Sequence, residues 1–193
     1  MMRIITGRAR GVKLNTLEGE ATRPTSERAK EAIFSVIQFD ILGKKVLDLF
    51  AGSGQMGLEA LSRGAEHAVL CDRSREAAAV INSNAIKTKL APFCDVLCSD
   101  WEIFLRTQKK RAKFDLVFLD PPYASGLIPK ALAKLDEYGL LGKDAIVVCE
   151  SGDENGFFGG DERLAARFEV QRSARYGVAH VLILRYRGEE ESV

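Results

Sequence analysis

Residues 45–57 have the sequence KVLDLFAGSGQMG, in which a short apolar run leads through a glycine-rich turn into a helix-forming segment. The apolar run predicts a buried β-strand at 45–50, and apolar residues at helical spacing predict a helix at 54–63. The glycines let the backbone turn tightly and approach a ligand at a helix N-terminus. A strand, a glycine turn and a helix in this order favour a site for a nucleoside cofactor.

The same alternation continues outward from this stretch. Further strands are predicted at 67–72, 94–99, 115–119 and 145–150, and further helices at 75–87 and 127–138. Strands separated by helices of this length are typical of βαβ units and a parallel sheet. Residues 168–176 and 178–187 leave no room for a helix and predict an antiparallel hairpin that turns near Gly177. The fold class is therefore α/β, a doubly wound, mostly parallel sheet.

Residues 1–44 do not follow this rhythm, and we expect them to form an extension to a domain at 45–193. A β-hairpin around Gly11 is predicted at 3–14, and an amphipathic helix at 27–38, with Ser26 as its N-cap. The residues of this helix expected to face inward are Ala29, Ile33, Val36 and Ile37. In the helix at 75–87 they are Ala78, Ile81, Ala85 and Ile86. Two further segments are expected to be a solvated connection and a loop, at 106–113 and 151–167.

Composition limits the classes of protein that fit. The chain has 193 residues, 46% of them hydrophobic, with 28 basic and 27 acidic side chains. This length suits one domain with a small extension, and the near-neutral charge excludes a histone-like or wholly disordered chain. No apolar run reaches the ~18 residues that a membrane helix needs, and the N-terminus has no stretch typical of a signal peptide. We therefore expect a cytoplasmic protein that contacts no membrane.

Four cysteines lie in or beside the predicted strands: Cys71, Cys94, Cys98 and Cys149. They form no Cys-x-x-Cys pair, and His67 and His180 are not grouped with them, so the pattern does not favour a zinc site. We expect reduced, buried thiols that pack as small hydrophobic side chains, and no bound metal.

An acidic residue extends the glycine motif. Asp72 lies twenty residues after Gly52, at the end of a predicted strand, where its carboxylate can accept hydrogen bonds from ribose hydroxyls. Gly52-x-Gly54-x-x-Gly57 followed by Asp72 also fits a dinucleotide fingerprint, so this motif leaves NAD and S-adenosylmethionine open. Asp48 favours the second, because a carboxylate beside the turn would attract the cationic amino-acid end of S-adenosylmethionine.

A second motif, Asp120-Pro121-Pro122-Tyr123, follows directly after the predicted strand at 115–119. The prolines fix φ, so the loop can present the Asp120 carboxylate and a backbone carbonyl to both hydrogens of an exocyclic amine. Tyr123 supplies a flat face on which a base can stack. Accepting both hydrogens makes the amine more tetrahedral and directs its lone pair at a methyl donor. We expect Asp120 to orient the amine and later take its proton, directly or through water.

DLFAGSG at 48–54 and DPPY at 120–123 resemble the class I S-adenosylmethionine-dependent methyltransferases that modify exocyclic amines. RIITGRARGVKL at 3–14, TRPTSERAKEAIF at 22–34 and LDLFAGSGQMGLEALSRGA at 47–65 are more narrowly similar to the bacterial small-subunit (16S) ribosomal RNA guanine-N2 methyltransferases, the RsmD family. The similarity covers nearly the whole chain, including VCESGDENG at 148–156.

This resemblance implies a Rossmann-like, seven-stranded sheet with an antiparallel terminal strand, S-adenosylmethionine as cofactor, and methyl transfer to guanine N2 in 16S ribosomal RNA. The substrate would be naked RNA or RNA in a partly assembled small subunit. Cofactor-binding residues are expected to be Asp48, Phe50, Ala51, Gly52, Ser53, Gly54, Gly57, Asp72, Arg73, Asp100 and Trp101; catalytic residues are expected to be Asp120, Pro121, Pro122 and Tyr123. Relatives often carry a glutamate near the ribose, whereas Cys71-Asp72-Arg73 stands here, so it stays open whether Asp72 alone contacts the ribose.

The N-terminal residues also suggest contact with nucleic acid, because residues 1–13 contain four basic side chains and no acidic one. A basic hairpin ahead of a catalytic domain is a reasonable clamp on RNA phosphates. The RNA-binding residues are expected to be Arg3, Arg8, Arg10, Lys13, Arg23 and Arg28, with Lys30 extending the cluster.

Two alternative functions remain open: methylation of an adenine or cytosine amine in DNA or of a protein glutamine, and an NAD-dependent oxidoreductase.

Overall fold

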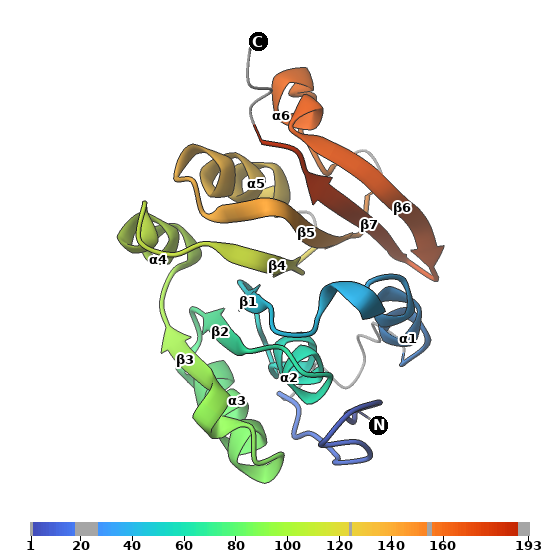
Figure 1. Ribbon diagram of the computed structural model, residues 1–193, viewed down its shortest axis with the longest axis vertical. Helices are drawn as coiled ribbons and strands as arrows, with labels where there is room; N and C mark the ends of the chain where they lie inside the picture. Colours follow the sequence, from blue (N-terminus) through green and yellow to red (C-terminus); the bar gives the residue numbers. More distant parts are fainter. Residues whose placement is uncertain (1, 18–26, 124, 154–155, 189–193) are drawn as a thin grey trace.

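The computed structural model describes residues 2–17, 27–123, 125–153 and 156–188. Its strands form a seven-stranded sheet in the order β3-β2-β1-β4-β5-β7-β6 (Figure 1). The strands are β1 Lys45–Asp48, β2 His67–Asp72, β3 Cys94–Cys98, β4 Phe114–Leu119, β5 Leu141–Ser151, β6 Phe168–Tyr176 and β7 Ala179–Tyr186. The α-helices are α1 Glu27–Val36, α2 Gln55–Ser62, α3 Arg75–Lys87, α4 Trp101–Gln108, α5 Leu127–Glu137 and α6 Glu162–Ala166. Two short 3-10 helices, η2 and η3, cover Gln38–Asp40 and Ala91–Phe93.

Helices cover both faces of the sheet (Figure 1). The buried cluster on one face includes side chains of α1, α2 and α3, such as Leu58 and Ile81. The cluster on the other face includes side chains of α4, α5 and α6, such as Leu105 and Leu132. This two-sided cover confirms the predicted doubly wound α/β fold.

The strand directions also agree with the sequence pattern. Strands β1 to β5 pair in parallel, and β7 lies antiparallel between β5 and β6. The carboxyl ends of the parallel strands therefore meet at one edge of the sheet, where open α/β sheets bind ligands. Among the described helices, none is long and apolar enough to cross a membrane.

The N-terminal segment packs onto the main sheet. Residues 2–14 double back, with Arg3 paired to Lys13, and the bend runs from Thr6 to Gly11 rather than centring on Gly11. Ile4, at 0% exposure, joins the same buried cluster as α1, α2 and α3. The segment is thus held by the core of the sheet, and the domain boundary at residue 44 stays a prediction.

Two helices were not expected from the sequence. Residues 101–108 form α4, which includes part of the predicted connection at 106–113. Asp100 starts α4 by accepting hydrogen bonds from the Glu102 and Ile103 amides. In the predicted loop at 151–167, α6 begins at the N-cap Asp161 and buries Leu164. Both helices are short, so an N-cap and one or two buried side chains stabilise them, and a repeating pattern of apolar residues is too brief to predict them.

Other boundaries differ by a few residues. The helix predicted at 75–87 is α3 with those bounds, but the strand predicted at 145–150 begins earlier, at Leu141. The predicted inward face of two helices is partly wrong, because Val36 and Ile86 are 42% and 70% exposed. In α1 the buried stripe runs through Lys30 and Phe34 instead. The predicted N-cap Ser26 lies outside the described residues.

The cysteines are only partly as expected. Cys71 and Cys149 are buried in β2 and β5, whereas Cys98 is exposed and Cys94 half-buried at the two ends of β3. Strand β3 is an edge strand, so it has a neighbour on one side only, which leaves its ends open to solvent. Among the described residues, no group of three or more histidine, cysteine, aspartate or glutamate side chains is placed to hold a metal ion.

Candidate active site

The glycine-rich loop lies between β1 and α2, at the carboxyl edge of the sheet. Gly52 and Gly54 have φ values of 53° and 78°, in the left-handed region that favours glycine. The Ala51 N–H donates to the Cys71 carbonyl at 3.0 Å, and the Gly54 N–H donates to the Ala51 carbonyl at 2.6 Å. The loop is therefore closed on itself and tied to the end of β2.

Asp72 connects two loops through its carboxylate. One oxygen accepts a hydrogen bond from the Gly52 N–H at 2.9 Å, and the other accepts one from the Ser74 N–H at 2.9 Å. Asp72 therefore supports the glycine loop itself. Because each carboxylate oxygen has two acceptor sites, these contacts leave capacity for a ribose hydroxyl. Arg73, next to it, is exposed, and its carbonyl accepts from the Cys98 thiol.

Asp48 lies under the loop and is 3% exposed. Its carboxylate accepts a hydrogen bond from the Gly57 N–H, in the first turn of α2, at 3.0 Å. Burial raises the pKa of the Asp48 carboxyl to about 7, while this hydrogen bond opposes the shift and the nearby Asp72 adds to it. A cation beside Asp48 would favour the ionised form, so the group is suited to a positively charged ligand.

Gly57 has a packing role as well. A Cβ built on it would lie 2.9 Å from Leu70 Cδ2 on β2, closer than real Cβ atoms approach. A larger residue would require the buried Leu70 side chain to shift. Gly57 thus sets how closely the helix approaches the loop, and it does not itself need to touch a ligand.

The third predicted acidic residue, Asp100, caps α4 with its Oδ1, 2.9 Å from the Glu102 amide. Beside it, the Trp101 ring packs against the Phe50 ring from the glycine loop, with ring centroids 6.3 Å apart. Burial, together with the nearby charges of Asp72, Asp100 and Asp48, raises the pKa of the Cys71 thiol to about 12. The structure therefore brings these three carboxylates around one point, near two aromatic rings.

This arrangement fits S-adenosylmethionine by the chemistry of its donors. The cofactor carries an ammonium group, a ribose diol and an adenine amine, and each of these needs an acceptor such as a carboxylate. A partly buried aromatic pair, Phe50 and Trp101, offers apolar surface for an adenine ring. Pyrophosphate, by contrast, would be repelled by Asp48.

The second motif borders a cavity of about 230 Å³. Its walls come from the segment between β4 and α5, the start of α5, the end of β5 and the segment after it. The described residues that line it are Pro121, Pro122, Tyr123, Ser125, Gly126, Leu127, Ile128, Glu150, Ser151, Asp153 and Gly156. Three of the four residues of the motif therefore meet a hollow beside the carboxyl edge of the sheet. Asp120 is half-buried and comes directly before this wall, but it is not one of the lining residues.

Tyr123 is held from two sides. Its hydroxyl donates to Glu150 Oε1 at 2.8 Å. A Cβ on Gly152 would lie 3.1 Å from Tyr123 Cγ, so the backbone of this loop lies close to the ring. Sequence analysis did not single out Glu150 as functional. The signal that could have found it is its place at the end of β5, the strand beside β4, because such ends meet at the ligand edge.

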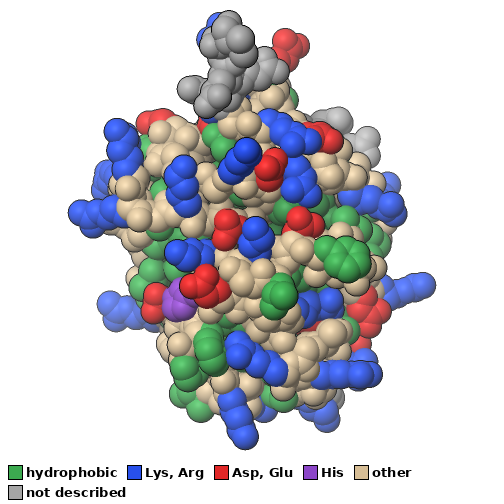
Figure 2. Space-filling model, in the orientation of Figure 1, with side chains coloured by type: hydrophobic (Ala, Val, Ile, Leu, Met, Phe, Trp, Pro, Cys, Tyr) green, Lys and Arg blue, Asp and Glu red, His purple; other side chains and the backbone are tan. Residues whose placement is uncertain are grey.

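The basic residues of the N-terminal segment are mainly at the surface. Arg8, Arg10, Lys13 and Arg28 are exposed. Arg3 forms an exposed ion pair with Glu27 at 3.2 Å, and the Arg8 guanidinium lies over the Phe93 ring at 4.0 Å from its centroid. On the lower part of the face in Figure 2, most of the charged side chains are Lys or Arg, with hydrophobic side chains between them. The predicted contact Arg23 lies outside the described residues.

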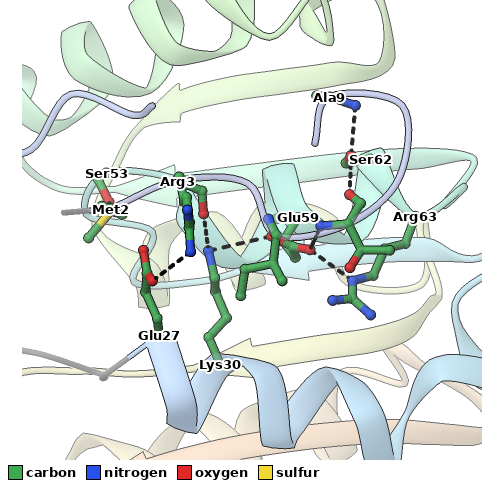
Figure 3. A network of polar contacts seen from close by, with 12 residues as sticks. Met2, Arg3, Ala9, Glu27, Lys30, Ser53, Glu59, Ser62 and Arg63 are labelled. Atoms are coloured by element: carbon green, nitrogen blue, oxygen red, sulfur yellow. Dashed lines mark hydrogen bonds and ion pairs between the residues drawn. The ribbon is translucent and has the colours of Figure 1, made fainter. Parts of the chain in front are cut away.

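Lys30 was expected to extend this basic cluster, and that prediction is wrong. Its side chain is 1% exposed and lies 3.4 Å from Glu59, which is fully buried on α2 (Figure 3). The Lys30 ammonium also donates to the Arg3 carbonyl at 2.6 Å. Burial lowers the pKa of this ammonium, and the attraction of Glu59 opposes the shift. Lys30 therefore joins α1 to α2 and cannot reach a phosphate at the surface.

Glu59 ties the N-terminal segment to α2. Its carboxylate accepts hydrogen bonds from the Ile5 N–H at 2.7 Å, the Thr6 N–H at 3.0 Å and Arg63 Nε at 2.9 Å (Figure 3). The Ser62 hydroxyl accepts from the Ala9 N–H and donates to the Thr6 carbonyl. Because α2 starts at the glycine loop, the hairpin is fixed to the helix that follows the candidate cofactor site.

The glycine loop itself contacts the N-terminal segment through Ser53. The Ser53 hydroxyl donates to the Met2 sulfur, and its carbonyl accepts from the buried Asn84 amide at 2.9 Å. Asn84 also bonds to the Asn15 backbone through both its oxygen and its nitrogen. Ser53, which was predicted to bind the cofactor, is thus already used to join the loop to α3 and the hairpin.

Comparisons with known proteins agree with this architecture and confirm the class I methyltransferase fold. Ribosomal RNA small subunit methyltransferase D of Escherichia coli is 37% identical over 155 residues, which are 80% of this chain and 77% of that protein. Bacillus subtilis YlbH is 37% identical over 188 residues, 97% of this chain and 100% of that protein. The solved structure of Escherichia coli yhhF superposes with a TM-score of 0.83 at 31% identity, over 97% of this chain and 99% of that chain.

A family model described as conserved hypothetical protein 95 matches residues 2–185. The match includes the N-terminal segment, the glycine loop, the DPPY motif and the terminal hairpin. The chain therefore belongs to this family, together with the ribosomal RNA small subunit methyltransferase D proteins, as the sequence motifs predicted.

Proposed function

We propose that the protein transfers a methyl group from S-adenosylmethionine to the exocyclic N2 amine of a guanine in small-subunit (16S) ribosomal RNA. One observation carries the proposal: Pro121, Pro122 and Tyr123 line a cavity at the carboxyl ends of β4 and β5, and β4 pairs with β1, the strand that ends at Asp48. The family's named members act on small-subunit ribosomal RNA, which supports the choice of substrate. The proposal places the enzyme in the cytoplasm, acting on RNA that is naked or in a partly assembled small subunit.

The chain offers acceptors for each polar part of the cofactor. Asp48 would face its ammonium group, Asp72 its ribose hydroxyls and Asp100 its adenine amine. When bound, S-adenosylmethionine supplies an activated methyl group on a sulfonium. The glycine loop would let the cofactor approach the backbone at the start of α2, and Phe50 with Trp101 would cover one side of the adenine.

Asp120 is expected to act on the target amine. Its carboxylate and the adjoining backbone carbonyl accept the two amine hydrogens, which localises the nitrogen lone pair and directs it away from the ring plane. The amine nitrogen gains the methyl group and becomes more acidic, and its proton then leaves to Asp120 or to water. Tyr123, held by Glu150, fixes one wall of the space in which the base must lie.

A paired guanine hides its amine in the duplex, so the target must be unstacked or flipped before it can enter the cavity. Unstacking the guanine costs free energy. Phosphate contacts made by the exposed basic residues Arg8, Arg10, Lys13 and Arg28 would offset part of that cost. Because the hairpin is fixed to α2, RNA bound there is held close to the cofactor side of the sheet.

The test is a transfer assay with purified protein and S-adenosylmethionine labelled in its methyl group. Small-subunit ribosomal RNA, genomic DNA and a mixture of proteins are supplied separately, and labelled nucleosides are identified by mass spectrometry. We expect label in RNA as N2-methylguanosine at one position. Label in adenine, cytosine or glutamine would replace the proposal by another amine methyltransferase. Thermal stabilisation by NAD and not by S-adenosylmethionine would favour an oxidoreductase.

A further inference from the structure

Two carboxylates follow neighbouring strands at the same level. In the parallel pairing of β4 and β5, Leu119 is opposite Cys149. Asp120 is the first residue after β4, and Glu150 is the residue of β5 that follows Cys149. Neighbouring strands are about 4.8 Å apart, so the backbones of Asp120 and Glu150 lie close together at the carboxyl edge of the sheet. Glu150 therefore lies beside Asp120, the residue that is proposed to hold the target amine.

Glu150 is buried and still borders the cavity. It is 6% exposed and is one of the lining residues, together with Tyr123, whose hydroxyl donates to its Oε1 at 2.8 Å. A carboxylate has two oxygens and can accept several hydrogen bonds at once. A buried acceptor favours a base that presents a hydrogen-bond donor to it and disfavours a base that presents another acceptor.

We infer that Glu150 selects guanine over other amine-bearing bases by accepting the N1–H that lies beside the N2 amine. This inference rests on the proposed function. In guanine the neighbour of the reacting amine is a donor, N1–H. In adenine and cytosine the ring nitrogen next to the amine is an acceptor instead, so the carboxylate would meet a lone pair. Asp120 then recognises an amine, and Glu150 recognises which base carries it.

A purely structural role for Glu150 makes a different prediction. If the carboxylate only holds the Tyr123 hydroxyl, its replacement should slow methylation of every base to the same degree. A glutamine in its place can still accept from Tyr123 through its oxygen, but it presents an NH₂ donor where the carboxylate was an acceptor. The two roles therefore differ in the ratio of rates between bases and not in the rate itself.

The experiment uses a fragment of small-subunit ribosomal RNA containing the guanine identified by the transfer assay. In a second fragment this guanine is replaced by 2-aminopurine, which keeps the N2 amine but has an unprotonated N1. The ratio of kcat/KM for guanine to that for 2-aminopurine is measured for the wild type, Glu150→Gln and Glu150→Ala. We expect both substitutions to lower this ratio at least tenfold, because they remove the acceptor that N1–H needs.

The matched control is Tyr123→Phe, which removes the hydroxyl and keeps Glu150. It should slow both fragments and leave the ratio within about threefold of the wild type. A ratio that falls less than tenfold in both Glu150 variants overturns the inference and leaves the proposed function in place. Failure of the wild type to methylate the guanine fragment overturns the proposed function itself. Where turnover is too slow to assay, the same ratio is taken from the affinities of the two fragments with S-adenosylhomocysteine present.

Discussion

The two halves of the carboxyl edge hold their functional side chains in different ways. Around β1, β2 and β3, Asp48, Asp72 and Asp100 each accept hydrogen bonds from backbone amides. Around β4 and β5, a hydrogen bond joins the side chains of Tyr123 and Glu150, both of which line the cavity. We call the edge around β1, β2 and β3 the cofactor half and the edge around β4 and β5 the target half. In the cofactor half the backbone holds the acidic side chains, whereas in the target half one side chain holds another. Substitutions should change turnover most on the target half and stability most on the cofactor half.

The largest effect should come from Asp120 on the target half. Asp120→Ala removes the carboxylate that orients the amine and takes its proton, and we expect kcat to fall by ~10²–10⁴-fold. The affinity for S-adenosylmethionine, measured by calorimetry, and the thermal midpoint should stay near the wild-type values. Glu31→Ala, an exposed substitution on α1, serves as the control. A variant that retains more than a tenth of the wild-type kcat would contradict the assigned role.

On the cofactor half, Glu59 offers the matching test of stability. Glu59→Ala leaves the Ile5 and Thr6 amides without their acceptor, and it leaves the buried Lys30 ammonium with the Arg3 carbonyl but without a carboxylate partner. Breaking a buried pair by removing one partner costs about 3–5 kcal/mol, so the free energy of unfolding in urea should fall by that amount.

The exposed Arg3–Glu27 pair is the control for this measurement, because both of its side chains are in water. Glu27→Ala should lower the free energy of unfolding by less than about 1 kcal/mol. Similar losses for the two variants would mean that the N-terminal segment is not fixed to α2 through Glu59, and the contrast between the two halves would weaken.

The fold and the two motifs could be predicted because they depend on local patterns. Glycines at a turn and prolines after a strand carry their geometry in consecutive residues, and the bounds of α3 agree with the helix predicted at 75–87. Lys30 could not be placed, because its partner Glu59 lies on another helix and only the folded chain brings them together. Glu150 was missed for the same reason, since its importance comes from the register of β5 beside β4.

A further test of the cofactor half concerns Asp48 and the pH. Its folded pKa is about 7, whereas an aspartate in the unfolded chain titrates near 3.8. Between these values the folded state holds a proton that the unfolded chain has lost, so the free energy of unfolding should fall as the pH rises from about 4 to 7, by roughly 1.4 kcal/mol per pKa unit. Asp48→Asn keeps an oxygen for the Gly57 N–H but does not titrate, so its stability should be flatter in this range.

The same titration should govern cofactor affinity if Asp48 faces the ammonium group. Only the ionised carboxylate attracts a cation, and at pH 6 roughly a tenth of the protein would be in that form when the pKa is about 7. Calorimetry should therefore show S-adenosylmethionine binding roughly five- to tenfold more tightly to the wild type at pH 7.5 than at pH 6, and little change for Asp48→Asn. Equal pH dependence in both proteins would show that Asp48 supports the glycine loop through Gly57 without contacting the cofactor. The role of Asp48 in the cofactor half would then be to hold the backbone in place.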